Sequence, residues 1–374
     1  MTYTASATPP KANSFTHKQI IITFYTPQAD GSFSNITIGQ DHAIHALIKH
    51  AGVALGSEAD ITIKGLFKKT REDFSIVPDY PMVDDLNHVL PGRTTIMLSV
   101  SDDNNAPLTT LFIGQINDAY TDYNDPDTPF QIHAMTNTIP AGILIPAKGY
   151  KGPYPALSIL QDICYAAKLQ LLNYGGWDHH QTLTNHYRSG TALDQIKGVV
   201  NATHIKYNIR PYTPITQDEA NNLPNSYKQQ ISQTTAHLGV VEIWGGSYTG
   251  TPPNGQEKSI PIISAQNGMV GYPKYNEAGT TITTLLRPDI AFWQPLILES
   301  KYAPQNWLPS PNQPNSLTNQ SHQLISKAPW DGLWLPIAIQ HEVSTEIAEG
   351  KWHTTIECIR TNLGQKPPHN KALS

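Results

Sequence analysis

The sequence contains only two cysteines, Cys164 and Cys358, which lie far apart in the chain. They cannot make a disulfide framework or a zinc site built from cysteines alone. No apolar run approaches the ~18–20 residues that a membrane-spanning helix needs. The first residues are polar and lack the apolar segment of a secretory signal. These absences predict a chain made in a reducing cytosol, with no membrane insertion.

Charge is also scarce, since Asp, Glu, Lys and Arg make up 15% of the 374 residues, against about 25% in an average soluble protein. The formal net charge of −5 supplies no general attraction to phosphate, which disfavours DNA-wrapping and anionic-membrane proteins. The 25 glycines and 30 prolines favour short strands and many turns. A hydrophobic content of 39% excludes wholesale disorder, and the length predicts more than one domain.

Residues 18–138 contain mainly strand-like runs and form the first expected domain. Residues 1–17 before it are expected to be a flexible N-terminal tail. One helix is expected over 41–51, because Ile44, Leu47 and Ile48 have i, i+3, i+4 spacing and Asp41 can cap it. Strands are predicted from short apolar runs between turn residues, at 20–25, 61–67, 94–100, 108–119 and 130–134.

Residues 139–257 predict a small α+β domain. Pro155 suits a first helical position, and Thr191 with Asp194 forms a pattern like a capping box at the start of a second helix. Strands are expected at 169–172, 204–209 and 240–244. The apolar stripe of the first helix comprises Leu157, Leu160, Ile163, Cys164 and Ala167, and that of the second comprises Leu193, Ile196, Val199 and Val200.

Residues 258–366 return to β texture and form a second expected β domain, before a C-terminal tail at 367–374. Strands are predicted at 280–286 and 292–300, and a hairpin joins 337–347 to 351–359. Alternation puts Trp352, Thr354, Ile356 and Cys358 on one face of that hairpin. Residues 303–336 are rich in Pro, Asn, Ser and Gln and predict a surface excursion, anchored by Trp307, Trp330 and Trp334.

Catalytic motifs are absent from the sequence. The glycine-rich run 245–251 lacks the lysine of a phosphate-binding loop and the spacing of a nucleophile elbow, so it predicts a loop after a strand. His341 and Glu342 begin like a zinc-protease helix, but Thr345 stands where the second histidine is required. Alternation there predicts a strand with the two side chains on opposite faces. A structural or binding role is favoured over catalysis.

Two groups of histidines could in principle bind a metal, and both have simpler interpretations. A histidine-rich segment follows Gly175 and Gly176, and these glycines predict that it is an exposed loop. Neutral imidazoles in this loop could bind zinc. His42 and His45 share the expected helix face with Lys49 and are interpreted as solvated. The histidine-rich segment comprises Asp178, His179, His180 and His186.

The carboxylate clusters and Cys164 also have plain interpretations. Paired carboxylates are predicted to be turn residues. For Asp122, Asp125 and Asp127, calcium binding is the alternative. Cys164 lies on the apolar stripe and is expected to act as a small hydrophobe. The carboxylate clusters are Asp84 and Asp85; Asp102 and Asp103; and Asp122, Asp125 and Asp127.

Several segments, taken in order, resemble phage baseplate hub proteins. Residues 268–273, Gly-Met-Val-Gly-Tyr-Pro, are followed by 279–290, which contain the run Leu-Leu-Arg-Pro-Asp. This resembles the glycine turn of such hubs, which leads into a strand ending in Leu-Leu-x-Pro. The helix start at 189–196 and the hairpin strand at 351–355, Lys-Trp-His-Thr-Thr, are also similar to hub segments. The likeness spans about residues 18–362.

The resemblance implies two β-barrel modules similar to the tail-tube protein, each with one helix or long loop, flanking the α+β domain. It implies a homotrimer that joins the sixfold tail tube to the threefold central spike and contacts other baseplate subunits. DNA would pass through the lumen without specific binding, and the protein would be a virion component assembled in the host bacterial cytoplasm. No enzymatic activity, cofactor or metal is implied.

Two alternative functions remain open from the sequence. One is a tail-associated, metal-dependent cell-wall hydrolase that uses Asp178, His179, His180 and His186. The other is a glycan-binding β module in which the three tryptophans of the 303–336 excursion stack on sugars.

Overall fold

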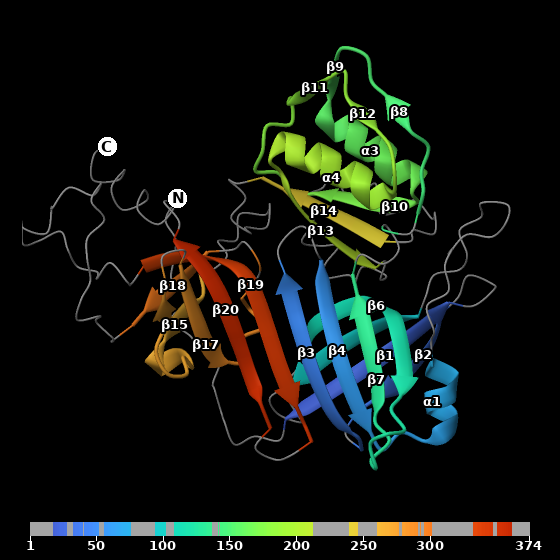
Figure 1. Cartoon of the computed structure of the whole chain (residues 1–374). Helices are drawn as coiled ribbons and strands as arrows, with labels where there is room; N and C mark the ends of the chain where they lie inside the picture. Colours follow the sequence, from blue (N-terminus) through green and yellow to red (C-terminus); the bar gives the residue numbers. More distant parts are fainter. Residues whose placement is uncertain are drawn as a thin grey trace, which may run out of the picture. The chain divides into compact units, whose positions relative to one another are not determined.

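The computed structural model describes residues 18–27, 33–39, 41–51, 56–75, 94–101, 108–136, 141, 143–211, 239–245, 260–276, 279–290, 292, 295–300, 332–346 and 350–360. The chain divides into two compact units, of which one contains Phe15–Lys258 and Gln340–Trp352 and the other contains Ser259–Ile339 and His353–Ser374. Strands dominate, and two longer helices lie together in one small α+β part (Figure 1). The predicted fold class, mainly β with an α+β part, is confirmed.

The N-terminal β module comprises residues 18–136 of the first unit. Its strands follow the order β3-β4-β7-β6-β5-β1-β2, and every neighbouring pair is antiparallel. All five predicted strands of this segment are confirmed. Its elements are β1 (Gln19–Pro27), β2 (Phe33–Ile38), β3 (Ala43–Ala51), β4 (Ser57–Lys64), α1 (Lys68–Phe74), β5 (Thr95–Ser101), β6 (Thr109–Thr121) and β7 (Phe130–Met135).

The core of this module is built by alternation along its strands. In β7, Phe130, Ile132 and Ala134 are buried while the residues between them are half-exposed. The short helix α1 covers part of the core, since Phe74 at its end stacks on Phe24 of β1 with ring centroids 4.2 Å apart. A buried aromatic pair of this kind stabilises the fold by more than its buried area alone.

The helix predicted over 41–51 is wrong, because these residues form strand β3. Ile44, Ala46 and Ile48 are all fully buried, so a period of two also fits this segment. Its pairing with β4 along eight residue pairs decides between the two periods. The sequence pattern missed α1, which has a single buried residue and no side-chain cap.

The α+β module contains a three-stranded sheet in the order β10-β14-β13, in which β10 and β14 are parallel. Two short antiparallel pairs, β9 with β11 and β8 with β12, complete it. The predicted strands are confirmed to within a few residues. The strands are β8 (Lys148–Gly149), β9 (Pro153–Pro155), β10 (Leu169–Asn173), β11 (Thr182–Thr184), β12 (Tyr187–Arg188), β13 (Lys206–Pro211) and β14 (Gly239–Trp244).

Both helices predicted for this module are confirmed as α3 (Ala156–Ala166) and α4 (Ala192–Thr203). Their apolar stripes and the sheet share one buried core. Thr191 caps α4 with a complete capping box: its hydroxyl accepts from the Asp194 backbone N–H at 3.1 Å, and the Asp194 carboxylate accepts from the Thr191 backbone N–H at 3.2 Å. None of the helices described in the structure is long and apolar enough to cross a membrane.

The C-terminal β module comprises residues 260–339 and 353–360 of the other unit. Strand β17 pairs with β16 and β20, and β18 pairs with β19 and, in parallel, with β15. The predicted strands and hairpin strands are confirmed. The elements are β15 (Ile262–Ser264), the 3-10 helix η1 (Ala265–Asn267), β16 (Lys274–Tyr275), β17 (Thr280–Leu285), β18 (Leu296–Glu299), β19 (Gly332–Ser344) and β20 (Trp352–Arg360).

Two predictions about the tryptophans of this region have different outcomes. Trp352 is buried together with Thr354, Ile356 and Cys358, which confirms the predicted hairpin face. Trp334 does not lie in a surface excursion, because it belongs to β19 and packs in the core near Tyr275. The rest of that predicted excursion, with Trp307 and Trp330, falls outside the described residues, as do the two predicted tails.

The capping box of α4 gives a testable prediction. Thr191→Ala removes the hydroxyl that accepts from the Asp194 N–H, and we expect a loss of about 1 kcal/mol in local helix stability. Gly198 of the same helix has open space where a Cβ would stand, so Gly198→Ala should raise local stability by roughly 0.5–1 kcal/mol. Hydrogen exchange of the α4 amides measures both changes, and equal protection in the two variants would contradict the assignment.

Candidate interface on the N-terminal β module

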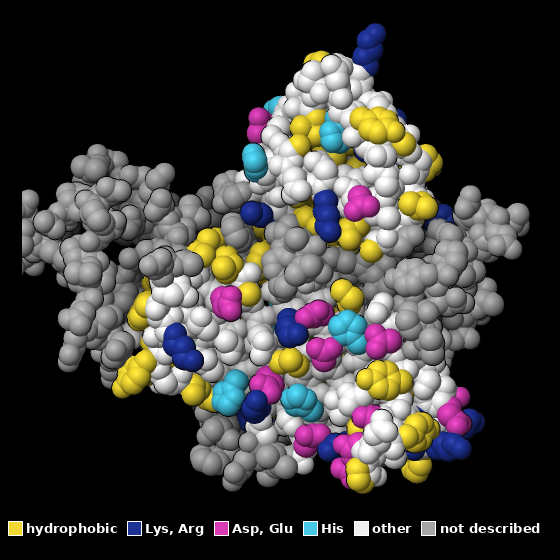
Figure 2. Space-filling model, viewed as in Figure 1, with side chains coloured by type: hydrophobic (Ala, Val, Ile, Leu, Met, Phe, Trp, Pro, Cys, Tyr) yellow, Lys and Arg dark blue, Asp and Glu magenta, His cyan; other side chains and the backbone are white. Residues whose placement is uncertain are grey.

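The outward side of strands β3, β4 and β7 carries charged and histidine side chains in place of the isoleucines that point inward. We name this surface the charged face. Figure 2 shows lysine, carboxylate and histidine side chains intermixed over β3 and β4. For a chain with so little charge this concentration is unusual. The charged face comprises His45 and Lys49 of β3, Glu58, Asp60 and Lys64 of β4, His133 of β7, Asp118 of β6, Asp127, Glu342, Glu346 and Lys351.

Two lysines of this face, Lys49 and Lys64, each lie between two carboxylates. The Nζ atom of Lys49 lies 3.0 Å from Glu58 and 3.8 Å from Asp60. Its hydrogen bond with Glu58 is the main cause that raises the pKa of Lys49 above its ordinary value. Asp60 also contacts Nδ1 of His133 at 2.7 Å. The pairs therefore form a connected row across three strands.

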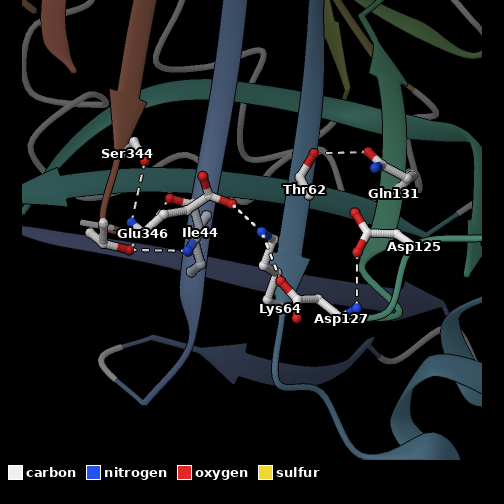
Figure 3. A network of polar contacts seen from close by, with 9 residues as sticks. Ile44, Thr62, Lys64, Asp125, Asp127, Gln131, Ser344 and Glu346 are labelled. Carbon is white, nitrogen blue, oxygen red and sulfur yellow. Dashed lines mark hydrogen bonds and ion pairs between the residues drawn. The ribbon is translucent and has the colours of Figure 1, made fainter. Parts of the chain in front are cut away.

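The second lysine of the row, Lys64, lies between Asp127 at 3.3 Å and Glu346 at 3.4 Å (Figure 3). The hydrogen bond to Asp127, followed by the charge of Glu346, raises the pKa of Lys64. Next to it, the Thr62 hydroxyl donates to Gln131 at 2.8 Å. This neutral pair continues the polar surface from β4 to β7.

Part of the charged face comes from the other end of the sequence. Residues 340–352, which we name the hairpin tip, lie along the chain between the two parts of the C-terminal β module but belong to the compact unit of the N-terminal β module. Glu342 lies 3.4 Å from His45 and 2.8 Å from Lys351. Burial would raise the pKa of Glu342, but its hydrogen bonds with Lys351 and His45 lower it below its usual value.

Backbone hydrogen bonds attach the hairpin tip to β3. The Thr345 backbone N–H donates to the Ile44 carbonyl at 2.8 Å, and the Ile44 N–H donates to the Thr345 hydroxyl oxygen at 3.1 Å. The two residues are 301 positions apart in the sequence. The tip thus adds to the edge of the N-terminal sheet beside β3, which removes an exposed edge that could pair with other chains.

Two histidines lie beneath this attachment. His341 is 2% exposed, and its ring meets that of His50 edge to face at 5.4 Å. Nδ1 of His50 lies 2.8 Å from the Ser57 hydroxyl. Burial lowers the pKa of His50 to about 4, and burial together with the nearby His50 lowers the pKa of His341 to about 3. Both rings are therefore neutral at physiological pH.

The described residues include no group of three His, Cys, Asp or Glu side chains that could hold a metal ion. Cys164 lies in the core as a small hydrophobe, as predicted, and its burial raises the pKa of the thiol to about 12. The free Cys358 is buried likewise.

The histidine-rich segment is exposed, as predicted. Asp178 accepts from the His180 backbone N–H at 2.9 Å, and His179 lies beside the Trp177 ring. His186 is separate and half-buried, and burial and the charge of Arg188 lower its pKa. The structure does not gather these four residues into one set of ligands.

The other sequence candidates have simpler roles. Asp122 and Asp125 accept backbone N–H groups two residues on, which confirms them as turn residues. His45 lies on a strand and not on a helix face, and it contacts Glu342. His341 is buried while Glu342 is half-exposed, so their opposite orientation in a strand is confirmed. The pairs Asp84 with Asp85 and Asp102 with Asp103 fall outside the described residues.

The turn that carries the hub resemblance is held by one buried arginine. Arg287 is 4% exposed, pairs with Asp289, and donates to the carbonyls of Ile262 and Asn267 at 3.1 and 3.3 Å. Gly268 within the turn has a φ of 89°, which favours glycine. Residues 268–273 and 279–290 therefore form a compact structural unit in the C-terminal β module.

Sequence reasoning missed the charged face. Its members come from six separate stretches of the chain, and each alone has the pattern of an ordinary exposed charge. Only the pairing of β3 with β4 and β4 with β7 places them side by side. Alternation within β4 was the one available signal, since it separates Glu58, Asp60 and Lys64 from the buried residues.

No family model matches the sequence, and no curated protein matches it. Among solved structures, the chain is similar to a tail protein from Neisseria meningitidis MC58, with 8% identity, 92% of this chain and 98% of that chain covered, and a TM-score of 0.49. It is also similar to the 43 kDa tail protein of prophage MuSo2 from Shewanella oneidensis, with 7% identity, 92% and 98% covered, and a TM-score of 0.47.

A third similar structure is an Escherichia coli component of the type VI secretion system, itself described as similar to T4 phage tail proteins. Its identity is 9%, the coverage is 86% of this chain and 74% of that chain, and the TM-score is 0.45. At such identities and scores the likeness assigns no role to individual residues.

The buried histidine pair predicts that the N-terminal β module loses stability in acid. The unfolded imidazoles protonate near pH 6.5 and the folded ones only near pH 4 and 3. Between these values the unfolded state binds more protons, so stability falls as pH drops from about 6.5 to about 3. His341→Phe should reduce this loss by on the order of 4 kcal/mol.

Urea denaturation followed at a series of pH values measures this effect. The matched control is His180→Gln, because His180 is exposed and its replacement should leave the pH profile as in the parent protein. Parallel profiles for His341→Phe and the parent would contradict the prediction.

The attachment of the hairpin tip gives a separate prediction. Thr345→Val keeps the shape of the side chain but leaves the Ile44 N–H without its acceptor, which should cost about 1–3 kcal/mol. Hydrogen exchange at Ile44 should rise accordingly. Ser344→Ala is the control, since its hydroxyl accepts from the exposed Glu346 N–H and not from β3 among the described residues. An equal effect of both changes would show that the attachment does not depend on Thr345.

Proposed function

We propose that this chain is a structural protein of a phage-type tail baseplate and, within it, the trimeric hub that joins the sixfold tail tube to the threefold central spike. The observation that carries the proposal is the order of modules: a β module, an α+β module and a second β module in one chain. The ordered segments that resemble hub proteins lie within these same modules and support the assignment.

The proposed role is geometric. Three copies of a chain with two β modules present six such modules, so one trimer can match a sixfold partner on one side and a threefold partner on the other. We propose that the two β modules resemble the tail-tube protein and that the domains run over 18–138, 139–257 and 258–366. The hairpin tip then links the last domain to the first within each copy.

Sparse charge is consistent with extensive contacts between copies, because burying charged groups at an interface carries a desolvation cost. We propose partners in the tube protein, the spike protein and other baseplate subunits, with the hub located in the virion after assembly in the host cytoplasm. DNA would pass through the lumen without specific binding, since the net charge of −5 offers phosphate no general attraction.

The proposal includes no catalytic activity, cofactor or metal. The hydrolase alternative needed Asp178, His179, His180 and His186 to converge, and they do not. The glycan alternative used Trp307, Trp330 and Trp334, of which Trp334 is buried in the core and the other two fall outside the described residues. Neither alternative has an observation in its favour.

Native mass spectrometry of the purified full chain, together with electron microscopy of particles that contain it, tests the proposal. We expect trimers in solution, or a threefold ring at the junction of tube and spike in the particles. A chain that remains monomeric at all concentrations and occupies no ring in particles would refute the hub assignment.

A further inference from the structure

The hairpin tip is an edge segment of its compact unit, and the strands behind it pair without it. In the sheet, β19 is the neighbour of β3, and Thr345 is hydrogen-bonded to Ile44 there. From the tip, β19 and β20 continue into the other compact unit. Strands β3, β4 and β7 pair with one another. Opening of the tip therefore breaks fewer contacts than unfolding of the whole N-terminal β module.

The inner side of this attachment carries two histidines, one from each partner. His341 of the tip is 2% exposed, and its ring lies 5.4 Å from that of His50 on β3. Alternation places His50 on the same side of β3 as the fully buried Ile48. The Ser57 hydroxyl of β4 lies 2.8 Å from its Nδ1 atom, and the Leu111 carbonyl of β6 lies against the same ring. A proton on either ring would bring charge into this interior.

Ionisable groups on the surrounding elements lie on the opposite side, in the charged face. Protonation of His45 would strengthen its contact with Glu342, which opposes release, but both side chains are partly exposed and such a pair adds little. On β20, the neighbour of β19, the buried residues Trp352, Thr354 and Ile356 do not ionise. The groups on the opposite side are His45 and Lys49 of β3, Glu58 and Lys64 of β4, Asp118 of β6, and Glu342, Glu346 and Lys351 of the tip.

Acid acts against the attachment through the buried pair. In the attached tip, burial lowers the pKa of His50 to about 4, and burial with the nearby His50 lowers that of His341 to about 3. In a released tip both rings meet water and regain a pKa near 6.5. The released state then binds more protons, so the attachment is strongest above about pH 6.5 and weakens as pH falls toward 4 and 3.

The carboxylate of Glu342 has the same sign but a lower range of pH. Burial would raise its pKa, but hydrogen bonds with Lys351 and His45 lower it below the ordinary value of 4.5. A carboxylate of this kind stabilises the attachment at higher pH and loses that contribution only as pH falls below this value. Between pH 7 and pH 5 the buried histidines therefore decide the effect of acid.

We propose that the hairpin tip is a pH-sensitive attachment, which acid releases from β3 while strands β3, β4 and β7 stay paired. The two rings face each other across the joint, so protonation on either side favours release. An apolar side chain at position 341 would fill a buried site without titrating, so packing alone does not require a histidine there. The inference concerns a single chain and does not rest on the proposed function.

Hydrogen exchange of the full chain at pH 7 and pH 5, followed by mass spectrometry and corrected for intrinsic exchange rates, tests the proposal. The opening constant of residues 340–352 should rise on the order of several hundredfold, because each released ring contributes roughly twentyfold over this range. Amides of β4 and β7 should have opening constants at least about tenfold below those of the tip at both pH values.

Variants assign the effect to the buried pair. His341→Phe leaves one titrating ring, so the rise should fall to roughly twentyfold. If circular dichroism shows that this variant does not fold, His50→Gln takes its place with the same expectation, since its amide can still bond to Ser57. The matched control is His180→Gln, which replaces an exposed histidine and should keep the full rise. Glu342→Gln should loosen the tip at both pH values and keep the rise.

Three results would overturn the proposal: an opening constant of the tip that is the same at pH 7 and pH 5, equal opening constants for the tip and β4 at pH 5, or a full rise in His341→Phe. A reduced rise in His341→Phe, with the full rise in His180→Gln and Glu342→Gln, supports it. Because the measurement concerns the tip within one chain, each of these results leaves the hub proposal as it was.

Discussion

The insertion of the hairpin tip beside strand β3 is the contact on which the arrangement of the chain depends. It joins residues 301 positions apart through hydrogen bonds between Ile44 and Thr345, so that a segment between the two parts of the C-terminal β module completes the edge of the N-terminal sheet. Closing such a distant contact costs chain entropy. That cost is offset by backbone hydrogen bonds, by the ion pairs of Glu342 and Glu346, and by burial of His341 beneath them.

The low charge content of the chain is best understood from where its charged side chains lie. Most of the surface needs few charges if it is to be buried against other subunits, since each buried ion must be desolvated. Nine charged side chains lie together on the charged face, and ion pairs connect most of them. Exposed ion pairs each add little to stability, although a connected row adds more than the same pairs in isolation.

Particular elements show how far the sequence could be interpreted. Strong local patterns, such as the capping box at Thr191 or the alternation from Trp352 to Cys358, predicted helices and strands correctly because the relevant physics acts within a few residues. Residues 43–51 satisfied both a helical and a strand period, and only pairing with β4 decided between them. Trp334 was assigned to a loop from its proline-rich surroundings, but strand β19 already includes it.

The sequence by itself determined the fold class, the α+β segment, the burial of Cys164 and the absence of catalytic motifs, because composition, periodicity and capping are local properties. Tertiary structure alone decided the strand at β3, the insertion of the hairpin tip, the neutral histidine pair and the charged face. Each of these depends on which distant strands pair. Strand pairing is selected by the free energy of the whole sheet and core, and no short stretch of sequence contains that information.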